Sequence, residues 1–101
     1  MAGIARGNGR DTVTTEHGCA STTTTNLCST TVFVDGIGVH RLNDLNTEHT
    51  IRCGDKCCKH AQPVSTASTT VFVDGLGVAR VGDRYSGCGH ISTGSETVFA
   101  D

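Results

Sequence analysis

Histidine and cysteine residues follow the same landmark in the chain three times. The landmark is an aspartate that closes a repeated segment, and the residues after it are His17 after Asp11, His49 after Asp44, and Cys88 and His90 after Asp83. Imidazole nitrogens and thiolate sulfurs are donors that Zn²⁺ prefers, and four of them fill a tetrahedral structural site. If the three landmarks surround a common axis, these four side chains converge on it. The sequence therefore predicts a structural zinc site with no position for a substrate, and iron is the alternative metal.

A second group of potential ligands lies between the second and third landmarks: Cys53, Cys57, Cys58 and His60. Two alternatives stay open for this group, a separate second metal cluster or the replacement of one member of the first set by His60. Cys19 and Cys28 flank a run of threonines, and they form either a disulfide across a hairpin or a reduced, partly buried pair. A structural zinc is worth about 10–16 kcal/mol in small peptides, whereas a disulfide contributes about 2–4 kcal/mol. We therefore expect the metal to be the main staple.

The segments that position these residues are three copies of one repeat. Residues 29–36 return letter for letter at 68–75, and a shorter third copy closes the chain at 94–101. What would follow the third copy is found at the start of the chain, as Gly3-Ile4-Ala5-Arg6. We therefore expect the last strand to lie beside the first, so that the two ends of the chain complete the third unit. The alternative is a recent duplication within an ordinary β-sandwich.

Each copy has the pattern of a short β-hairpin. Residues 31–34 and 70–73 are β-branched or aromatic, and the Asp-Gly pair after each is a strong hairpin-turn signal. The glycines, threonines and valines disfavour helix, and no stretch of twelve residues has an apolar helical stripe. The predicted fold is all-β, a small cone of short β-hairpins with pseudo-three-fold repeat symmetry, stapled by a metal near the apex. It forms a single domain over residues 1–101, and the insertions between the hairpins should meet at one end.

Composition and charge argue against several classes of function. The net charge of −2 gives no basic field, which argues against nucleic acid as a partner. No apolar run is long enough to span a membrane, and the first ten residues lack the apolar region of a secretory signal. We therefore expect synthesis in the cytoplasm, where six cysteines more often mean metal ligands or reduced thiols than disulfides.

An enzyme and a stand-alone metal protein are the competing interpretations. His17 near Cys19, or His60 near Cys58, would supply a thiol and a base. Catalytic pairs are positioned by the fold rather than by adjacency in sequence, and no third orienting group stands out. We therefore expect no enzyme activity and no small-molecule substrate. A stand-alone zinc-binding module or metallochaperone is the alternative that uses the same ligands.

The chain resembles the PAAR-repeat proteins, which cap the spikes of contractile injection machines. The resemblance is carried by the order x-A-R-x-G-D, C-G-H and G-S-x-T-V-F, found at residues 77–83, 88–90 and 94–99. Looser matches stand at residues 3–17 and 39–49, so the resemblance covers essentially the whole chain. No Pro-Ala-Ala-Arg string is present, and the cysteine-rich insertion at 53–60 departs from the family pattern. The resemblance implies a zinc near the apex held by three His and one Cys, which again selects the tetrad given above.

The resemblance also implies a partner. The base of such a tip binds the blunt end of a trimeric β-helical spike, one tip per trimer, by adding strands to three exposed edges at once. The residues expected to contact the spike are Val32, Phe33, Val34, Val71, Phe72, Val73, Val98 and Phe99. We expect no self-oligomer and no toxin domain within the chain, and whether a separate effector is carried stays open. We expect a site of action at the tip of a phage tail or type VI secretion spike that pierces a target-cell envelope.

Overall fold

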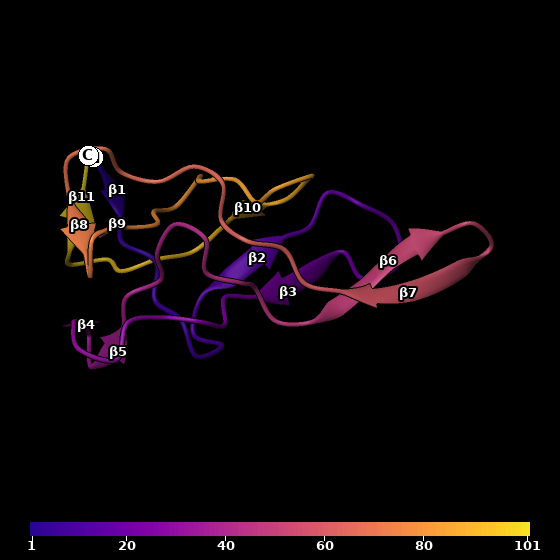
Figure 1. Ribbon diagram of the computed structural model, residues 1–101, viewed down its shortest axis with the longest axis horizontal. Coiled ribbons are helices and arrows are strands. Elements are labelled where there is room, and N and C mark those ends of the chain that lie inside the picture. The colour runs from indigo at the N-terminus through magenta and orange to yellow at the C-terminus, as the bar shows by residue number, and fades with distance from the viewer.

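Short antiparallel strands and loops make up the whole molecule, which contains no helix. The computed structural model describes residues 1–101 and extends 41 × 23 × 21 Å (Figure 1). No segment forms a helix long and apolar enough to cross a membrane. The strands are β1 (Ala2–Gly3), β2 (Thr12–Thr14), β3 (Thr22–Thr24), β4 (Phe33–Val34), β5 (Ile37–Gly38), β6 (His49–Cys53), β7 (Lys56–His60), β8 (Phe72–Val73), β9 (Leu76–Gly77), β10 (His90–Ile91) and β11 (Phe99–Ala100). The predicted all-β class is confirmed.

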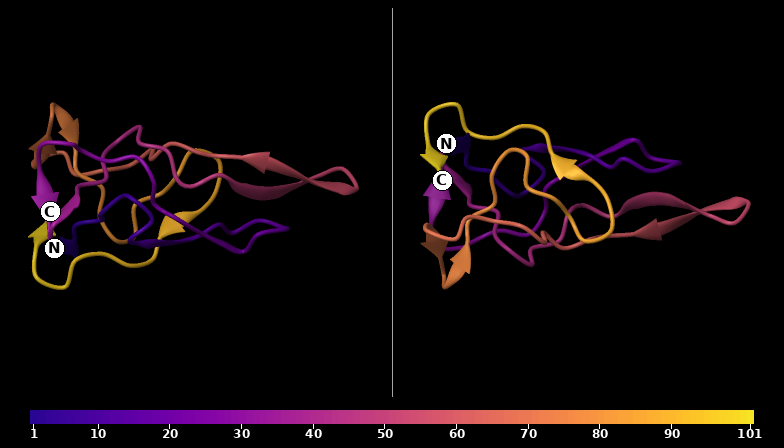
Figure 2. Two further views of the ribbon diagram at one scale, coloured as in Figure 1. Left: turned by 90° about the horizontal axis from the view of Figure 1, so that it is seen from below. Right: turned by 90° about the horizontal axis from the view of Figure 1, so that it is seen from above.

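Three two-stranded units lie together at one end of the molecule, which we call the base. They are the hairpins β4–β5 and β8–β9 and the pair β11–β1, in which the last strand of the chain meets the first (Figures 1 and 2). Ala2 is opposite Ala100 and Gly3 is opposite Phe99, so the predicted union of the two chain ends is confirmed. In the first hairpin, Asp35 and Gly36 have φ values of 55° and 79°. Positive φ at both central residues is the mark of a type I′ turn, which Asp-Gly favours.

The strands of the base are shorter than the β-branched runs predict, because a serine intercepts their first amide groups. The Oγ of Ser29 accepts hydrogen bonds from the backbone N–H of Thr31 at 3.1 Å and of Val32 at 2.9 Å. Ser68 and Ser95 accept equivalent bonds in the other two units. Amides held by a serine side chain are not available to a strand ladder. Each hairpin ladder therefore begins at the phenylalanine.

A closed ring of backbone hydrogen bonds joins the three units. The N–H of Ala5 donates to the carbonyl of Ala79 at 2.9 Å, that of Ala79 to His40 at 2.9 Å, and that of His40 to Ala5 at 3.0 Å. Each unit therefore donates once and accepts once. The three sequence repeats thus make equivalent backbone contacts with one another. The chain does not form the alternative fold, a sandwich of two packed sheets that contains a duplicated segment.

Arginine–aspartate pairs repeat in the same way. The backbone N–H and the guanidinium of Arg6 both donate to Asp11, and the pairs Arg41–Asp44 and Arg80–Asp83 repeat this arrangement. Arg6 also reaches Asp35 in the turn of β4–β5, and Arg41 reaches Asp74 in the turn of β8–β9. The pKa of each arginine is raised, first of all by the hydrogen bond to its own aspartate.

The hydrophobic core is small and is divided into two clusters. One lies behind the base hairpins and consists of Ile4, Val34, Val39, Val73, Val78 and Ala100. The other consists of Ala5, Val13, Val64, Ala79, Tyr85 and Ile91. Val34 and Val73 were predicted to face a spike, but they point inward, because alternate side chains of a strand lie on opposite faces. The neighbouring Phe33 and Phe72 take the outward positions and are more than half exposed.

The insertion between the hairpins β4–β5 and β8–β9, residues 45–67, contains the longest hairpin in the chain. Strands β6 and β7 pair over five residues each and extend away from the body, at the end opposite the base (Figure 1). The segment between β2 and β3, residues 15–21, runs beside this hairpin and pairs with it through a bridge between Cys19 and Ile51. Residues 15–21 and the hairpin β6–β7 both lie in insertions between the base units. They therefore meet at the same end of the molecule, as predicted. Between the two ends lies the three-stranded sheet β10–β2–β3.

Candidate metal centre

The register of the long hairpin places two histidines directly opposite each other. His49 begins β6 and His60 ends β7, and they are cross-strand partners. Partners in an antiparallel pair project their side chains from the same face of the hairpin. Their Nε2 atoms lie 2.8 Å apart. The hairpin alone thus brings two imidazoles together at its root, where it joins the body.

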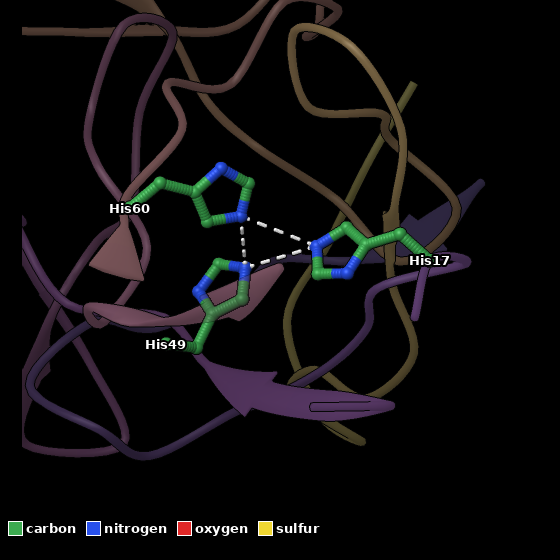
Figure 3. Close-up of side chains that lie close together, drawn as sticks. All are labelled: His17, His49 and His60. Carbon is green, nitrogen blue, oxygen red and sulfur yellow. Dashed lines mark hydrogen bonds between the residues drawn. The ribbon is translucent and has the colours of Figure 1, made fainter. Parts of the chain in front are cut away.

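The third histidine comes from the segment that crosses from β2 to β3. The Nε2 of His17 lies 3.2 Å from the Nε2 of His49 and 3.2 Å from that of His60, so three ring nitrogens point at one another (Figure 3). His49 is buried, and the other two are half-buried. These three residues form a group whose donor atoms are close enough to hold one metal ion. We call this group the histidine trio.

Hydrogen bonds on the far side of two rings decide which nitrogen carries the proton. The Nδ1 of His17 lies 3.0 Å from the carbonyl of Gly18, and the Nδ1 of His49 lies 2.8 Å from the carbonyl of Thr47. A carbonyl only accepts, so each Nδ1 carries the hydrogen and each neutral ring has a lone pair on Nε2. Two such lone pairs facing each other at 3.2 Å repel, unless a cation lies between them. Backbone carbonyls on Nδ1 are also the usual outer partners of metal-bound histidine.

The electrostatics at His60 also favour a neutral imidazole. Burial lowers the pKa of His60, and the neighbouring His49 and His17 lower it further. A metal binds neutral imidazole, so a lowered pKa keeps the ligand in its binding form. Zinc bonds of 2.0–2.1 Å in a tetrahedral site separate two nitrogens by about 3.3 Å. The distances between the Nε2 atoms fit that geometry after a small expansion, and they leave one tetrahedral position to a fourth ligand.

Two of the four predicted ligands lie outside the trio. His90 is in β10, opposite Thr14, and its Nδ1 lies 3.3 Å from a carboxylate oxygen of Glu16. The same carboxylate accepts a hydrogen bond from the N–H of Gly89 at 3.0 Å and from Arg84 at 2.6 Å. These contacts, the bond from Gly89 first, lower the pKa of Glu16. His90 thus belongs to a hydrogen-bonded ion-pair group next to His17.

Cys88 is a half-buried free thiol outside the trio. The structure therefore brings together His17 and His49 from the predicted set, and His60 joins them in place of Cys88 and His90. The reason is the unforeseen hairpin, which delivers His60 opposite His49. A sequence signal for this exists: Gly54-Asp55 lies midway between the two histidines, and Gly54 has a φ of 63°. Glycine followed by aspartate is a two-residue hairpin turn, and counting outward from it pairs His49 with His60.

Four of the six cysteines form disulfides, contrary to the expectation of metal ligands or reduced thiols. Cys19 is bonded to Cys57, and Cys53 is bonded to Cys58. The alternative of a second metal cluster built on Cys53 and Cys57 is therefore not realised. Cys28, which the sequence offered as a partner for Cys19, is a free thiol, and burial raises its pKa.

Comparison with known proteins adds one match. Residues 53–101 match the family model of the PAAR motif. This range contains β7, the second base hairpin, the Arg80–Asp83 pair and the last strand of the chain. No curated protein matches the chain. This match confirms the resemblance to the PAAR-repeat proteins over residues 53–101, just under half of the chain.

Proposed function

We propose that this chain is a structural tip that caps a trimeric β-helical spike in a contractile injection machine, a phage tail or a type VI secretion system. The PAAR motif is associated with spike-tip proteins of such machines. The observation that carries the proposal is the exposed surface of the base. Each of its three units presents a valine and a phenylalanine to solvent: Val32 and Phe33, Val71 and Phe72, and Val98 and Phe99.

A three-fold partner suits this surface better than any single-chain partner. The three phenylalanines are 57%, 58% and 47% exposed, at equivalent positions of equivalent hairpins. Apolar side chains exposed together on a small protein mark an interaction surface. A trimeric β-helix ends in three identical sets of unpaired strand edges, and each two-stranded unit of the base has open edges to offer them. One monomer with three similar units can therefore match a trimer.

The end of the molecule opposite the base also supports the proposed function, because it is cross-linked. There the long hairpin has no large core behind it and is held by two disulfides and the histidine trio. Cross-links of this kind resist mechanical separation better than a thin apolar contact does. We propose that a zinc ion in the trio keeps this end folded while contraction drives the tip through a target envelope.

The test is to mix this protein with a purified trimeric β-helical spike protein and to measure the complex by native mass spectrometry. We expect one copy of this chain per three spike chains. Phe33→Ser, Phe72→Ser and Phe99→Ser should each weaken binding to a similar degree, by roughly tenfold or more for a buried aromatic anchor. Leu27→Ser is the matched control, because Leu27 is 47% exposed but belongs to none of the three base units. Equal loss in the control, or a stoichiometry other than one to three, would contradict the proposal.

A stand-alone zinc-binding module is the second candidate. The observation that favours it is the fourth metal position, which the three imidazoles leave to an exchangeable ligand. Such a module passes its zinc to a competing chelator within minutes and forms no complex with a spike trimer. A tip retains its zinc and binds the trimer, so the two measurements together separate the candidates.

A further inference from the structure

The three members of the histidine trio are not positioned equally well. His49 and His60 lie in one hairpin, and five consecutive cross-strand pairs fix their register. His17 lies in the connection between β2 and β3, outside any strand. This connection contacts the hairpin through the bridge between Cys19 and Ile51 and through one hydrogen bond, from the N–H of Ala20 to the carbonyl of Thr50 at 3.1 Å. Non-covalent contacts thus tie His17 to its partners only weakly.

A covalent bond supplements these contacts. Cys19 stands two residues after His17, and its disulfide partner Cys57 stands three residues before His60 in β7. The bond therefore joins the carrier of one ligand to the strand that carries another. No other covalent link connects residues 15–21 to the hairpin.

The backbone around His17 is held in a conformation that it would not keep alone. Glu16 and Cys19 have φ values of 63° and 73°, in the left-handed region that side chains other than glycine rarely adopt. Such residues are strained and persist where surrounding contacts over-determine them. The carboxylate of Glu16 is held by Arg84 and by the N–H of Gly89, whereas Cys19 is held by its disulfide. Besides the bridge to Ile51, the disulfide is therefore the contact that holds Cys19, and with it the segment of His17, against the hairpin.

We propose that the Cys19–Cys57 disulfide is the positioning bond of the metal centre, so that metal affinity depends on the oxidation state of this bond. The inference rests on the metal-binding trio of the proposed function. In the reduction step, a dithiol gives up two electrons and two protons and becomes a disulfide, while the Cys19–Cys57 bond becomes two thiols. The oxidised protein then holds three preorganised imidazoles, and the reduced protein holds two.

The second disulfide provides a matched control. Cys53–Cys58 cross-links the same hairpin near its Gly54-Asp55 turn, and it does not involve the segment that carries His17. Its removal leaves the register of His49 and His60 to the backbone ladder. If a disulfide merely stiffens the hairpin, removal of either bond lowers the zinc affinity to the same degree. If Cys19–Cys57 acts by placing His17, only the removal of that bond lowers the zinc affinity.

The experiment measures zinc affinity by competition with a fluorescent chelator, with the folded protein kept oxidised. Serine replaces cysteine because free thiols would themselves bind zinc. We expect Cys19→Ser/Cys57→Ser to bind zinc about 10–100-fold more weakly, the usual loss when a group that orients a metal ligand is removed. Cys53→Ser/Cys58→Ser should stay within about threefold of the wild type, by the same reasoning. Far-UV circular dichroism of each variant checks that the strands persist.

A mutant cycle tests whether the disulfide acts through His17. In the His17→Ala background, removal of Cys19–Cys57 should change zinc affinity little, because the ligand that it positions is already absent. Additive losses in the cycle, or equal losses for the two disulfides, would overturn the inference while leaving the metal site intact. Failure of the oxidised wild type to bind zinc would instead overturn the metal site itself.

The coupling has a reciprocal measurement. If oxidation tightens zinc binding tenfold, zinc must make the bond harder to reduce by the same factor, because the linkage is symmetric. For a two-electron couple, tenfold corresponds to about 30 mV. Titration with a dithiol redox buffer, read by mass spectrometry of alkylated peptides, should show this shift for Cys19–Cys57 and not for Cys53–Cys58. Equal potentials with and without zinc would contradict the coupling.

Discussion

The base and the long hairpin lie at opposite ends of the molecule and are stabilised in different ways. The base repeats one unit three times, and its stability comes from the backbone ring, the arginine–aspartate pairs and a six-residue apolar cluster. The hairpin β6–β7 occurs once, its outer residues are exposed, and it depends on cross-links. The three base units bond to one another in a closed ring, so this end needs no disulfide. A protruding hairpin without a core does need a cross-link.

The comparison also separates two kinds of cost in mutation. In the base, a substitution removes a group that other buried groups depend on, so the whole fold should lose stability. In the hairpin, loss of a cross-link should first open the hairpin itself and leave the base intact, because local opening has its own free energy. The predictions below distinguish these two responses.

The largest effect is expected from breaking the most buried ion pair of the base. Asp11 is 1% exposed and accepts three hydrogen bonds from Arg6, at 2.7, 3.0 and 2.8 Å. Asp11→Ala leaves the buried guanidinium of Arg6 with only the more exposed Asp35 as a partner, and the loss of the buried carboxylate costs about 3–5 kcal/mol. Urea denaturation measures the loss. Asp44→Ala is the matched change in another repeat, where Arg41 likewise keeps a second aspartate, and it should cost less, because the Arg41 side chain is 18% exposed against 8% for Arg6. Equal costs would show that burial of the arginine does not set the energy.

The next effect concerns the disulfides, measured without metal. In the chain-entropy description, a bond that closes a loop of 38 residues contributes about 4 kcal/mol, and one that closes a loop of 5 contributes about 2 kcal/mol. Removing Cys19–Cys57 should therefore destabilise more than removing Cys53–Cys58. Hydrogen exchange should be faster in residues 49–60 in both variants, and in residues 15–21 only in the variant without Cys19–Cys57, with the base amides of Ala5 and Ala79 still protected. Loss of protection at the base would show that the two ends unfold as one unit.

Zinc should produce a somewhat smaller change of opposite sign. At a free concentration one hundred times the dissociation constant, a ligand that binds only the folded state stabilises it by about 2.7 kcal/mol. Slower hydrogen exchange should appear around the trio, and His49→Ala should abolish it. Cys88→Ser should leave the effect of zinc unchanged, because Cys88 lies outside the trio. A loss of zinc binding in Cys88→Ser as large as that in His49→Ala would restore the ligand set that the sequence suggested.

The base could be predicted from the sequence because short-range sequence features determine its structure and because the repeat that carries them occurs three times. An Asp-Gly pair specifies the turn of each of the two base hairpins, and the split third copy requires the chain ends to meet. Each feature acts over a few residues, so its effect did not depend on the rest of the fold. The buried positions of Val34 and Val73 follow from the alternation of side chains along a strand, a pattern that the sequence carries.

The metal centre was harder to predict because it depends on register and on redox state. The offsets of His17 and His49 from their aspartates were informative, and both residues reach the trio. The same rule selected His90, which β10 and the carboxylate of Glu16 hold outside the trio, and Cys88, which is a free thiol outside the trio. Residues 45–67 have no apolar alternation, so no periodicity marks the strands that carry His60. The pairing of Cys19 with Cys57, 38 residues apart, is a property of the assembled fold alone.

The smallest effect is expected where the base departs from its own repetition. In the backbone ring, two repeats contribute alanine and the third contributes His40, which is fully buried. Its Nδ1 lies 2.6 Å from the carbonyl of Leu27, which only accepts, so Nδ1 carries the hydrogen. The Nε2 is then an acceptor, and the hydroxyl of Tyr85 donates to it at 2.8 Å. Both side chains are thereby fixed as neutral groups, and burial lowers the pKa of His40 and raises that of Tyr85.

The sign of the resulting pH dependence follows from the lowered pKa of His40. The unfolded chain protonates this residue near its ordinary pKa of about 6.5, whereas the folded chain resists protonation. The stability that neutral His40 contributes is therefore complete above that pH and falls as the pH drops toward the folded-state pKa. His40→Gln keeps a donor and an acceptor but does not titrate, so its free energy of unfolding should vary less with pH in this range. Measuring both proteins with zinc chelated lets the remaining histidines cancel in the difference. Parallel curves would mean that this buried imidazole takes up its proton without cost, and that the one irregular position of the base is no weaker than the positions that repeat.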